Sequence, residues 1–221
     1  MTQGSRSLGA VLWDMDGLLV DSEPVWTIAE QELAVLLGGT WSDALKARIV
    51  GTRLDVAVPT ILAHYGRNLA ETAWACDWLL TRMVELFGQQ LTVLPGVREL
   101  LAELQIAGVP VALVSSSYRV LVDAVVRSGF TFDLTLAGDE VRQGKPDPEP
   151  YLTAARLLGV PPGACLVLED SGAGVRSGLA AGCAVLAVPS VSGVRFDPAA
   201  RLTVRGTLAG MTVNELRGCL G

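Results

Sequence analysis

After Pro95-Gly96, short apolar runs alternate with amphipathic stretches, and a similar apolar run that ends at a turn signal lies near the start of the chain. Apolar runs of this length, bounded by turn residues, are typical of buried parallel strands. Strands that alternate with helical stretches predict a parallel sheet with right-handed crossovers. The predicted strands are Ala10–Trp13, Val109–Val114, Phe132–Ala137, Cys165–Leu168 and Ala184–Val188. The predicted helices are Val97–Ala107, Tyr118–Ser128, Pro148–Leu158 and Val175–Ala181, followed by an end piece from Leu202 to Leu220.

The region after the first predicted strand has a different pattern, with long helical periodicity and no convincing strand. The helices expected there are Glu23–Leu37, Asp43–Val50, Leu54–Tyr65 and Glu71–Phe87. We therefore predict an α/β fold with a Rossmann-like core at residues 1–20 and 92–221 and an inserted all-helical domain at 21–91. Gly17–Ser22 and Leu91–Gly96 would be the linkers. Ligands of open α/β sheets bind beyond the carboxyl ends of the strands, so the insert is expected to cover the site.

Composition restricts the class of protein. Half of the 221 residues are apolar, which is enough for a sizeable core. The net charge of −6 argues against a nucleic-acid partner, because phosphate backbones require a basic face. Neither a signal peptide nor a membrane-spanning run is evident, so a cytoplasmic protein is expected. The four cysteines form no CxxC pair and are expected to be free and mostly buried. The sequence does not determine the oligomeric state, although a monomer is slightly favoured.

Four polar segments follow predicted strands and would meet at one edge of the sheet. They are Asp14–Gly17, Ser115–Ser117, Gly144–Pro146 and Glu169–Ser171. Each has an ordinary explanation when taken alone, because Asp and Gly favour turns and Ser and acidic residues favour helix starts. Together they bring carboxylates, hydroxyls and an ammonium to one place. A carboxylate can attack phosphorus and hold it as an acyl phosphate, and Mg²⁺ prefers hard oxygen ligands.

In order and spacing, these four segments resemble the motifs of the haloacid dehalogenase-like hydrolase superfamily. The resemblance covers about residues 10 to 190. It implies that Asp14 is the nucleophile and that Asp16 is the general acid and then the base. It implies Mg²⁺ as the cofactor, held by the Asp14 carboxylate, the Asp16 backbone carbonyl and Asp170, with Glu169 nearby. Phosphoryl oxygens would be bound by Ser115, Ser116 and Lys145.

The helical insert resembles the cap of the β-phosphoglucomutase-like branch, where phosphatases and mutases compete as interpretations. The mutase pattern places a gating histidine where this chain has Trp26, which favours hydrolysis. His64, the only histidine, lies in a predicted insert helix with no acid or nucleophile beside it. Phosphonate cleavage is disfavoured because Lys46, the only lysine of the insert, lies in no supporting motif.

Segments around Glu23 and around Gly51–Asp55 resemble hexitol and deoxyhexose phosphatases of this branch. Arg53 and Glu23 are therefore the expected substrate contacts, although Arg53 could equally be a surface arginine at a helix start. The expected function is a phosphatase acting on a small phosphorylated metabolite, such as a sugar or sugar-alcohol phosphate. Two alternatives remain: a phosphosugar mutase, and a noncatalytic binding protein on the same fold.

Overall fold

A parallel sheet of six strands forms the centre of the computed structural model, which describes residues 7–50, 52–191 and 194–220. The order across the sheet is β5-β4-β1-β6-β7-β8, so the first strand of the chain lies in the interior of the sheet. The strands are β1 Ala10–Trp13, β4 Val111–Val114, β5 Leu134–Leu136, β6 Cys165–Glu169, β7 Ala184–Ala187 and β8 Leu202–Val204. Every residue of β1, β4, β6 and β7 is buried, as expected for a parallel sheet covered on both faces.

Successive residues of these strands contribute to two different hydrophobic clusters, one on each face of the sheet. In β1, Val11 and Trp13 belong to the larger cluster, whereas Ala10 and Leu12 belong to the smaller one. The same alternation holds in β4, β6 and β7, because side chains of a strand point to opposite faces in turn. The sheet therefore separates two cores.

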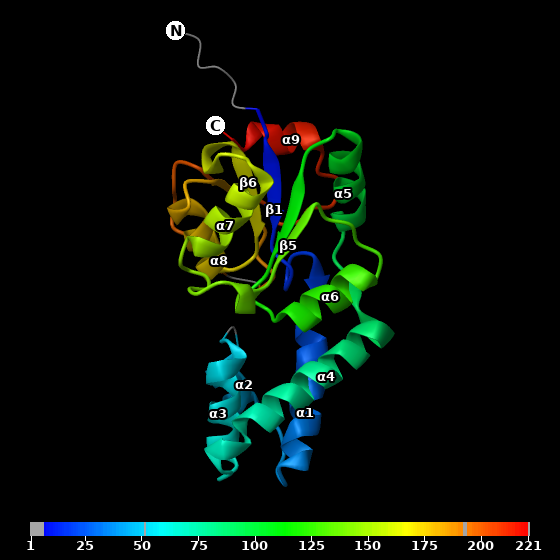
Figure 1. Cartoon of the computed structure of the whole chain (residues 1–221), viewed down its shortest axis with the longest axis vertical. Helices are drawn as coiled ribbons and strands as arrows, with labels where there is room; N and C mark the ends of the chain where they lie inside the picture. Colours follow the sequence, from blue (N-terminus) through cyan, green and yellow to red (C-terminus); the bar gives the residue numbers. More distant parts are fainter. Residues whose placement is uncertain (1–6, 51, 192–193, 221) are drawn as a thin grey trace.

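Helices cover both faces (Figure 1). Apolar residues of α7 (Glu149–Leu158) and α8 (Gly172–Ala180) belong to the smaller cluster. Those of α5 (Val97–Ile106), α6 (Arg119–Arg127) and α9 (Val213–Gly218) belong to the larger one. The larger cluster also includes apolar residues of the helical insert, so packing is continuous from that face of the sheet into the insert.

The described residues of the insert form four α-helices and a short 3-10 helix (Leu69–Glu71), and the insert lies beyond the carboxyl edge of the sheet (Figure 1). The helices are α1 Glu23–Leu36, α2 Asp43–Ile49, α3 Leu54–His64 and α4 Thr72–Gln90. Both chain segments that connect it to the core contain short strands, β2 (Val20–Asp21) and β3 (Thr92–Val93), which pair with each other in antiparallel fashion. The insert therefore enters and leaves through one two-stranded ribbon.

The predicted fold class is confirmed, and most predicted elements differ from the structure only at their ends. Larger differences have local causes. Helix α8 begins at Gly172 rather than Val175, because Ser171 caps it and accepts a hydrogen bond from the Gly174 amide at 3.0 Å. Gly172 and Gly174 are poor helix formers, so the sequence pattern does not indicate a helix before Val175. The paired linkers β2 and β3 and the strand β8 were not predicted, since strands of two or three residues carry too little pattern.

All four cysteines are free thiols, of which Cys165 and Cys183 are buried while Cys76 and Cys219 are half-buried. Among the described helices, none combines the length and the apolar character needed to cross a bilayer.

Leu12 provides a test of the interior position of β1. Its side chain is fully buried in the smaller cluster, whereas Leu152 on α7 is 41% exposed. We expect Leu12→Ala to lower the free energy of unfolding by about 2–5 kcal/mol, because it leaves a cavity. The matched change Leu152→Ala should cost about 0.5 kcal/mol or less. Urea unfolding followed by circular dichroism measures both, and equal losses would contradict this placement of β1.

Candidate active site

Asp14 directly follows β1 and lies at the carboxyl edge of the sheet. Its backbone N–H donates to the carbonyl of Leu168 at 3.0 Å, which continues the pairing of β1 with β6. The residue is 6% exposed. One carboxylate oxygen, Oδ1, accepts a hydrogen bond from the Lys145 ammonium, while Oδ2 accepts none from the described residues. Asp14 thus presents one restrained and one available oxygen.

Lys145 reaches this edge from the loop after β5, and its side chain is only 4% exposed. Besides Asp14, its Nζ donates to the Val114 carbonyl at 2.9 Å and to Glu169 Oε1 at 2.7 Å. Burial lowers the pKa of Lys145, but the carboxylates of Asp14 and Glu169 outweigh burial and hold the pKa well above its usual value. The ammonium is therefore charged and shared between two carboxylates and a strand end.

Glu169, the last residue of β6, is completely buried and accepts five hydrogen bonds. Oε1 accepts from Lys145 and from the Tyr151 hydroxyl at 2.8 Å. Oε2 accepts from the Asp170 amide, the Ser171 amide and the Ser171 hydroxyl, each at 3.0 Å. Burial alone would raise the pKa of Glu169, but Lys145 and these donors lower it below its usual value. A charged Glu169 consequently anchors the Lys145 ammonium.

Asp16 lies two residues beyond Asp14 and accepts hydrogen bonds from three serine hydroxyls. Ser22, between β2 and α1, donates to Oδ1 at 2.6 Å. Ser117 donates to Oδ2 at 2.8 Å, and Ser115 donates to the same atom at 3.3 Å. Asp16 is thus connected both to the loop after β4 and to the segment that leads into the insert.

The carboxylates at this edge suit a hard metal ion. Asp14, Glu169 and Asp170 each offer an oxygen within 4.8 Å of the others. In the described part of the chain, Lys145 is the only cation that forms a salt bridge with these three side chains. Burial raises the pKa of Asp14 well above its usual value; Lys145 opposes the rise, and the neighbouring carboxylates add to it. Burial likewise raises the pKa of Asp170 to about 6, against a hydrogen bond from Ser190. The excess of negative charge and the all-oxygen donor set fit a divalent cation.

The remaining predicted phosphate and substrate contacts lie in different places. Ser115 is 3% exposed, whereas Ser116 is an exposed residue of the same loop. Arg53, at the start of α3, lies against the loop that carries Lys145, because its Nη1 is 3.1 Å from the position a Cβ on Gly144 would take. Glu23, at the start of α1, is largely exposed and pairs with Lys46 at 3.1 Å. Gly51, which belongs with Arg53 to the segment expected to contact the substrate, lies outside the described residues.

Three other residues of the insert bear on the choice among functions. Trp26 is half-buried and packs against the larger cluster. His64 ends α3, at the opposite end from Arg53, and its exposed ring contacts Tyr65 edge to face. Lys46 forms a salt bridge with Glu30 at 2.8 Å as well as with Glu23. Lys46 is therefore engaged in an ion-pair network within the insert.

Several residues that hold this site were not singled out from the sequence: Ser22, Ser117, Tyr151, Gly174 and Ser190. Ser117 belongs to a serine run that was recognised, but the pattern does not reveal which hydroxyl contacts Asp16. Tyr151 lies a few residues after Gly144–Pro146, but Ser190 is 20 residues beyond Asp170, and only the packing of α7 and of the loop after β7 brings them to Glu169 and Asp170.

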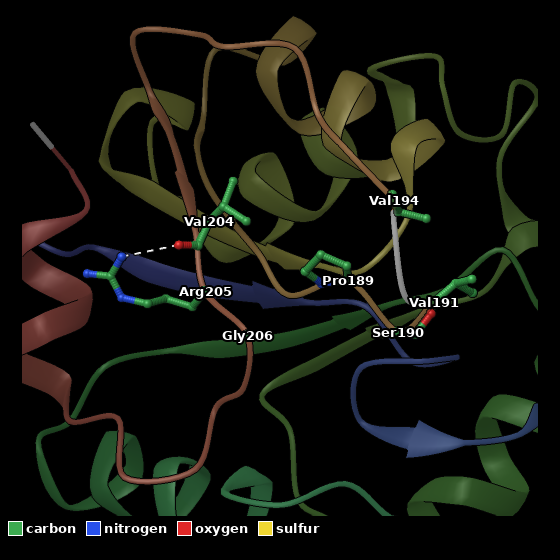
Figure 2. A pocket seen from close by; sticks show the side chains of 7 residues that line it. All are labelled: Pro189, Ser190, Val191, Val194, Val204, Arg205 and Gly206. Atoms are coloured by element: carbon green, nitrogen blue, oxygen red, sulfur yellow. Dashed lines mark hydrogen bonds between the residues drawn. The ribbon is translucent and has the colours of Figure 1, made fainter.

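A pocket of about 330 Å³ lies between the loop after β7 and the end of β8 (Figure 2), and one of its lining residues, Ser190, donates a hydrogen bond to Asp170. It is lined by Pro189, Ser190, Val191, Val194, Val204, Arg205 and Gly206. The Arg205 side chain points away from the pocket, and its Nη1 donates to the Val204 carbonyl at 3.2 Å. The pocket walls thus combine the Ser190 hydroxyl and backbone polar atoms with the apolar side chains of proline and valine residues.

Comparison with known proteins assigns the chain to a family. The haloacid dehalogenase-like hydrolase family matches residues 8–182. The chain belongs to this family. Hexitol phosphatase A of Escherichia coli is 37% identical over 180 residues, which cover 80% of this chain and 81% of that protein. The bifunctional riboflavin kinase/FMN phosphatase of Arabidopsis thaliana is 35% identical over 82% of this chain, but this match spans only 48% of that longer protein. CbbY from Rhodobacter sphaeroides, solved in complex with phosphate, superposes with a TM-score of 0.85 at 27% identity, covering 95% of this chain and 99% of that one.

Gly174 provides a test of the Glu169 anchor. A Cβ on Gly174 would lie 1.6 Å from Glu169 Oε1, whereas one on Gly172, in the same helix turn, would meet only the tip of the Arg176 side chain at 3.3 Å. We expect Gly174→Ala to lower the free energy of unfolding by about 3 kcal/mol, because the carboxylate must move. Gly172→Ala should leave stability within about 1 kcal/mol of wild type. Urea unfolding of both variants checks this, and similar stabilities would show that Glu169 is not packed against Gly174.

Proposed function

We propose that this protein is a Mg²⁺-dependent phosphatase that hydrolyses a small phosphorylated metabolite through a phosphoaspartate on Asp14. The observation that carries the proposal is the placement of Asp14, buried at the sheet edge with Lys145 on one oxygen and the other oxygen available. A carboxylate held in this way can attack phosphorus, and a covalent intermediate divides one difficult displacement into two easier ones. The phosphatase names of relatives such as hexitol phosphatase A support hydrolysis.

Each neighbouring group has a proposed part in this reaction. Lys145 and Ser115, with Ser116, would bind the phosphoryl oxygens and balance charge that develops in the transition state. Asp16 would give a proton to the leaving oxygen and later take one from the attacking water. Its position two residues after Asp14 supports this, since alternate residues of an extended chain face the same side.

The carboxylates of Asp14 and Asp170 and the backbone carbonyl of Asp16 are the proposed ligands of Mg²⁺, with Glu169 adding negative charge nearby. A bound divalent cation would reduce the repulsion between an anionic nucleophile and an anionic phosphate. The mutual distance of these carboxylates, within 4.8 Å, supports this assignment.

A sugar or sugar-alcohol phosphate is the proposed substrate. Arg53 supports it, since this insert residue lies against Gly144, next to Lys145, where it would meet the leaving group of a substrate bound at Asp14. Glu23 is proposed as a second polar contact. We also propose that the insert forms a separate domain over residues 21–91, which covers the substrate bound to the core.

The first test is the nucleophile. Purified protein should be screened against a panel of phosphorylated metabolites with Mg²⁺, and phosphate release measured on the best substrate. Asp14→Asn should lower the rate to less than about a thousandth of wild type, a loss of roughly 4 kcal/mol in barrier terms, since an amide does not attack phosphorus. Unchanged circular dichroism serves as the control, and a rate well above that level would exclude Asp14 as the nucleophile.

The second test is the metal. Phosphate release should stop in a chelator and return when Mg²⁺ is added in excess. Ca²⁺ should not restore it, because its larger and looser coordination shell misplaces nucleophile and phosphate. Asp170→Ala should raise the Mg²⁺ concentration needed for half-maximal activity at least about tenfold. Full activity in the chelator would disprove metal dependence.

The third test separates hydrolase from mutase. With glucose 1-phosphate and hexose 6-phosphates, we expect inorganic phosphate to appear one-for-one with the dephosphorylated sugar, because Trp26 replaces the gating histidine. Phosphorus NMR with and without a sugar bisphosphate primer measures this. Conversion of one phosphate isomer into another that depends on the primer would establish the mutase alternative.

A further inference from the structure

The carboxylate of Asp170 is held on one of its two oxygens. The Ser190 hydroxyl donates a hydrogen bond to Oδ2 at 2.5 Å. Gly17 approaches the same oxygen from another side, since a Cβ there would lie 2.2 Å from Oδ2 and 3.0 Å from Ser190 Oγ. Gly17 has a φ of +81°, which glycine adopts without strain. Oδ2 is therefore enclosed between a hydroxyl donor and a backbone position without a side chain.

The other oxygen has no such restraint. Among the described residues, Oδ1 of Asp170 accepts no hydrogen bond, although Asp170 belongs to the carboxylate group formed with Asp14 and Glu169. A carboxylate with one oxygen fixed by a donor can turn the other toward a cation without further loss of side-chain freedom. Partners of this kind, which bind a metal ligand rather than the metal, orient the ligand and strengthen metal binding.

The sheet fixes the position of the loop that carries Ser190. In the β6–β7 pair, Glu169 lies opposite Ala187, and the Val188 amide donates to the Glu169 carbonyl at 2.7 Å. Ser190 follows two residues later and lies at the wall of the pocket next to the site (Figure 2). The hydroxyl therefore comes from a segment whose start is held by backbone pairing to the residue before Asp170.

From this geometry we propose that Ser190 is a positioning residue that orients Asp170 for a divalent cation. The proposal rests on the metal dependence argued above. Ser190 itself does not touch the cation or the substrate. Its contribution is to keep Oδ2 occupied, so that Asp170 binds the cation through Oδ1.

Direct metal binding tests this role without turnover. Mn²⁺ is added to chelator-treated protein without substrate, and the dissociation constant is measured from the EPR signal of free Mn²⁺ and by calorimetry. We expect Ser190→Ala to weaken Mn²⁺ binding about tenfold. Ser190→Thr, which retains the hydroxyl, should bind Mn²⁺ within about twofold of wild type.

Ser128→Ala is the matched control. It removes a serine hydroxyl that donates only to the Val125 carbonyl, at the end of α6. It should leave Mn²⁺ binding unchanged, and thermal unfolding of the metal-free variants should show that all are folded. Equal Mn²⁺ affinity of wild type and Ser190→Ala would overturn the role of Ser190 while leaving the metal proposal intact. Failure of wild type itself to bind Mn²⁺ would instead overturn the metal proposal.

Discussion

The ammonium of Lys145 is the contact on which the arrangement of the site depends. It bonds to the carboxylates of Asp14 and Glu169 and to the carbonyl that ends β4, so one group joins three strands of the sheet. A charge removed from water is tolerated only when its partners are close and correctly placed. Glu169 meets that condition because Tyr151, Ser171 and two backbone amides hold it. The carboxyl edge of the sheet, where the active site is proposed, is therefore built outward from a buried ion pair.

That ion pair also explains why the site suits an added cation. The Lys145 ammonium is already shared by two carboxylates, and Asp170 lies within the same group without a salt bridge among the described residues. A second positive side chain from the protein would occupy space that the proposed phosphate group needs. A removable divalent ion instead supplies charge while its remaining coordination positions stay open to water or substrate.

The overall architecture could be predicted from local patterns in the sequence, whereas the residues proposed for the chemistry stood out only through the order and spacing of four segments. Buried parallel strands are continuous apolar runs, and Asp14, Lys145 and Asp170 lie directly after strands or in recognisable loops. The supporting residues left no comparable pattern. Ser190 is one serine in the loop after β7, and Tyr151 looks like any buried residue of an amphipathic helix until its hydroxyl is seen at Glu169. Short pieces such as β2, β3 and β8 were missed because their stability comes from neighbours distant in sequence.

The interior position of β1 has a consequence for how the chain reaches this structure. Val11 pairs with Val111 on one side, and Ala10 pairs with Cys165 on the other. During synthesis the first strand therefore leaves the ribosome long before either partner exists, whereas the helices of the insert can form from local contacts. Pairings between distant segments are slow to form, because a long loop must close before any contact compensates for the lost entropy. The apolar strand that precedes Asp14 therefore stays unpaired until at least about half of the chain has been made, and its exposed apolar surface is prone to aggregation during that interval.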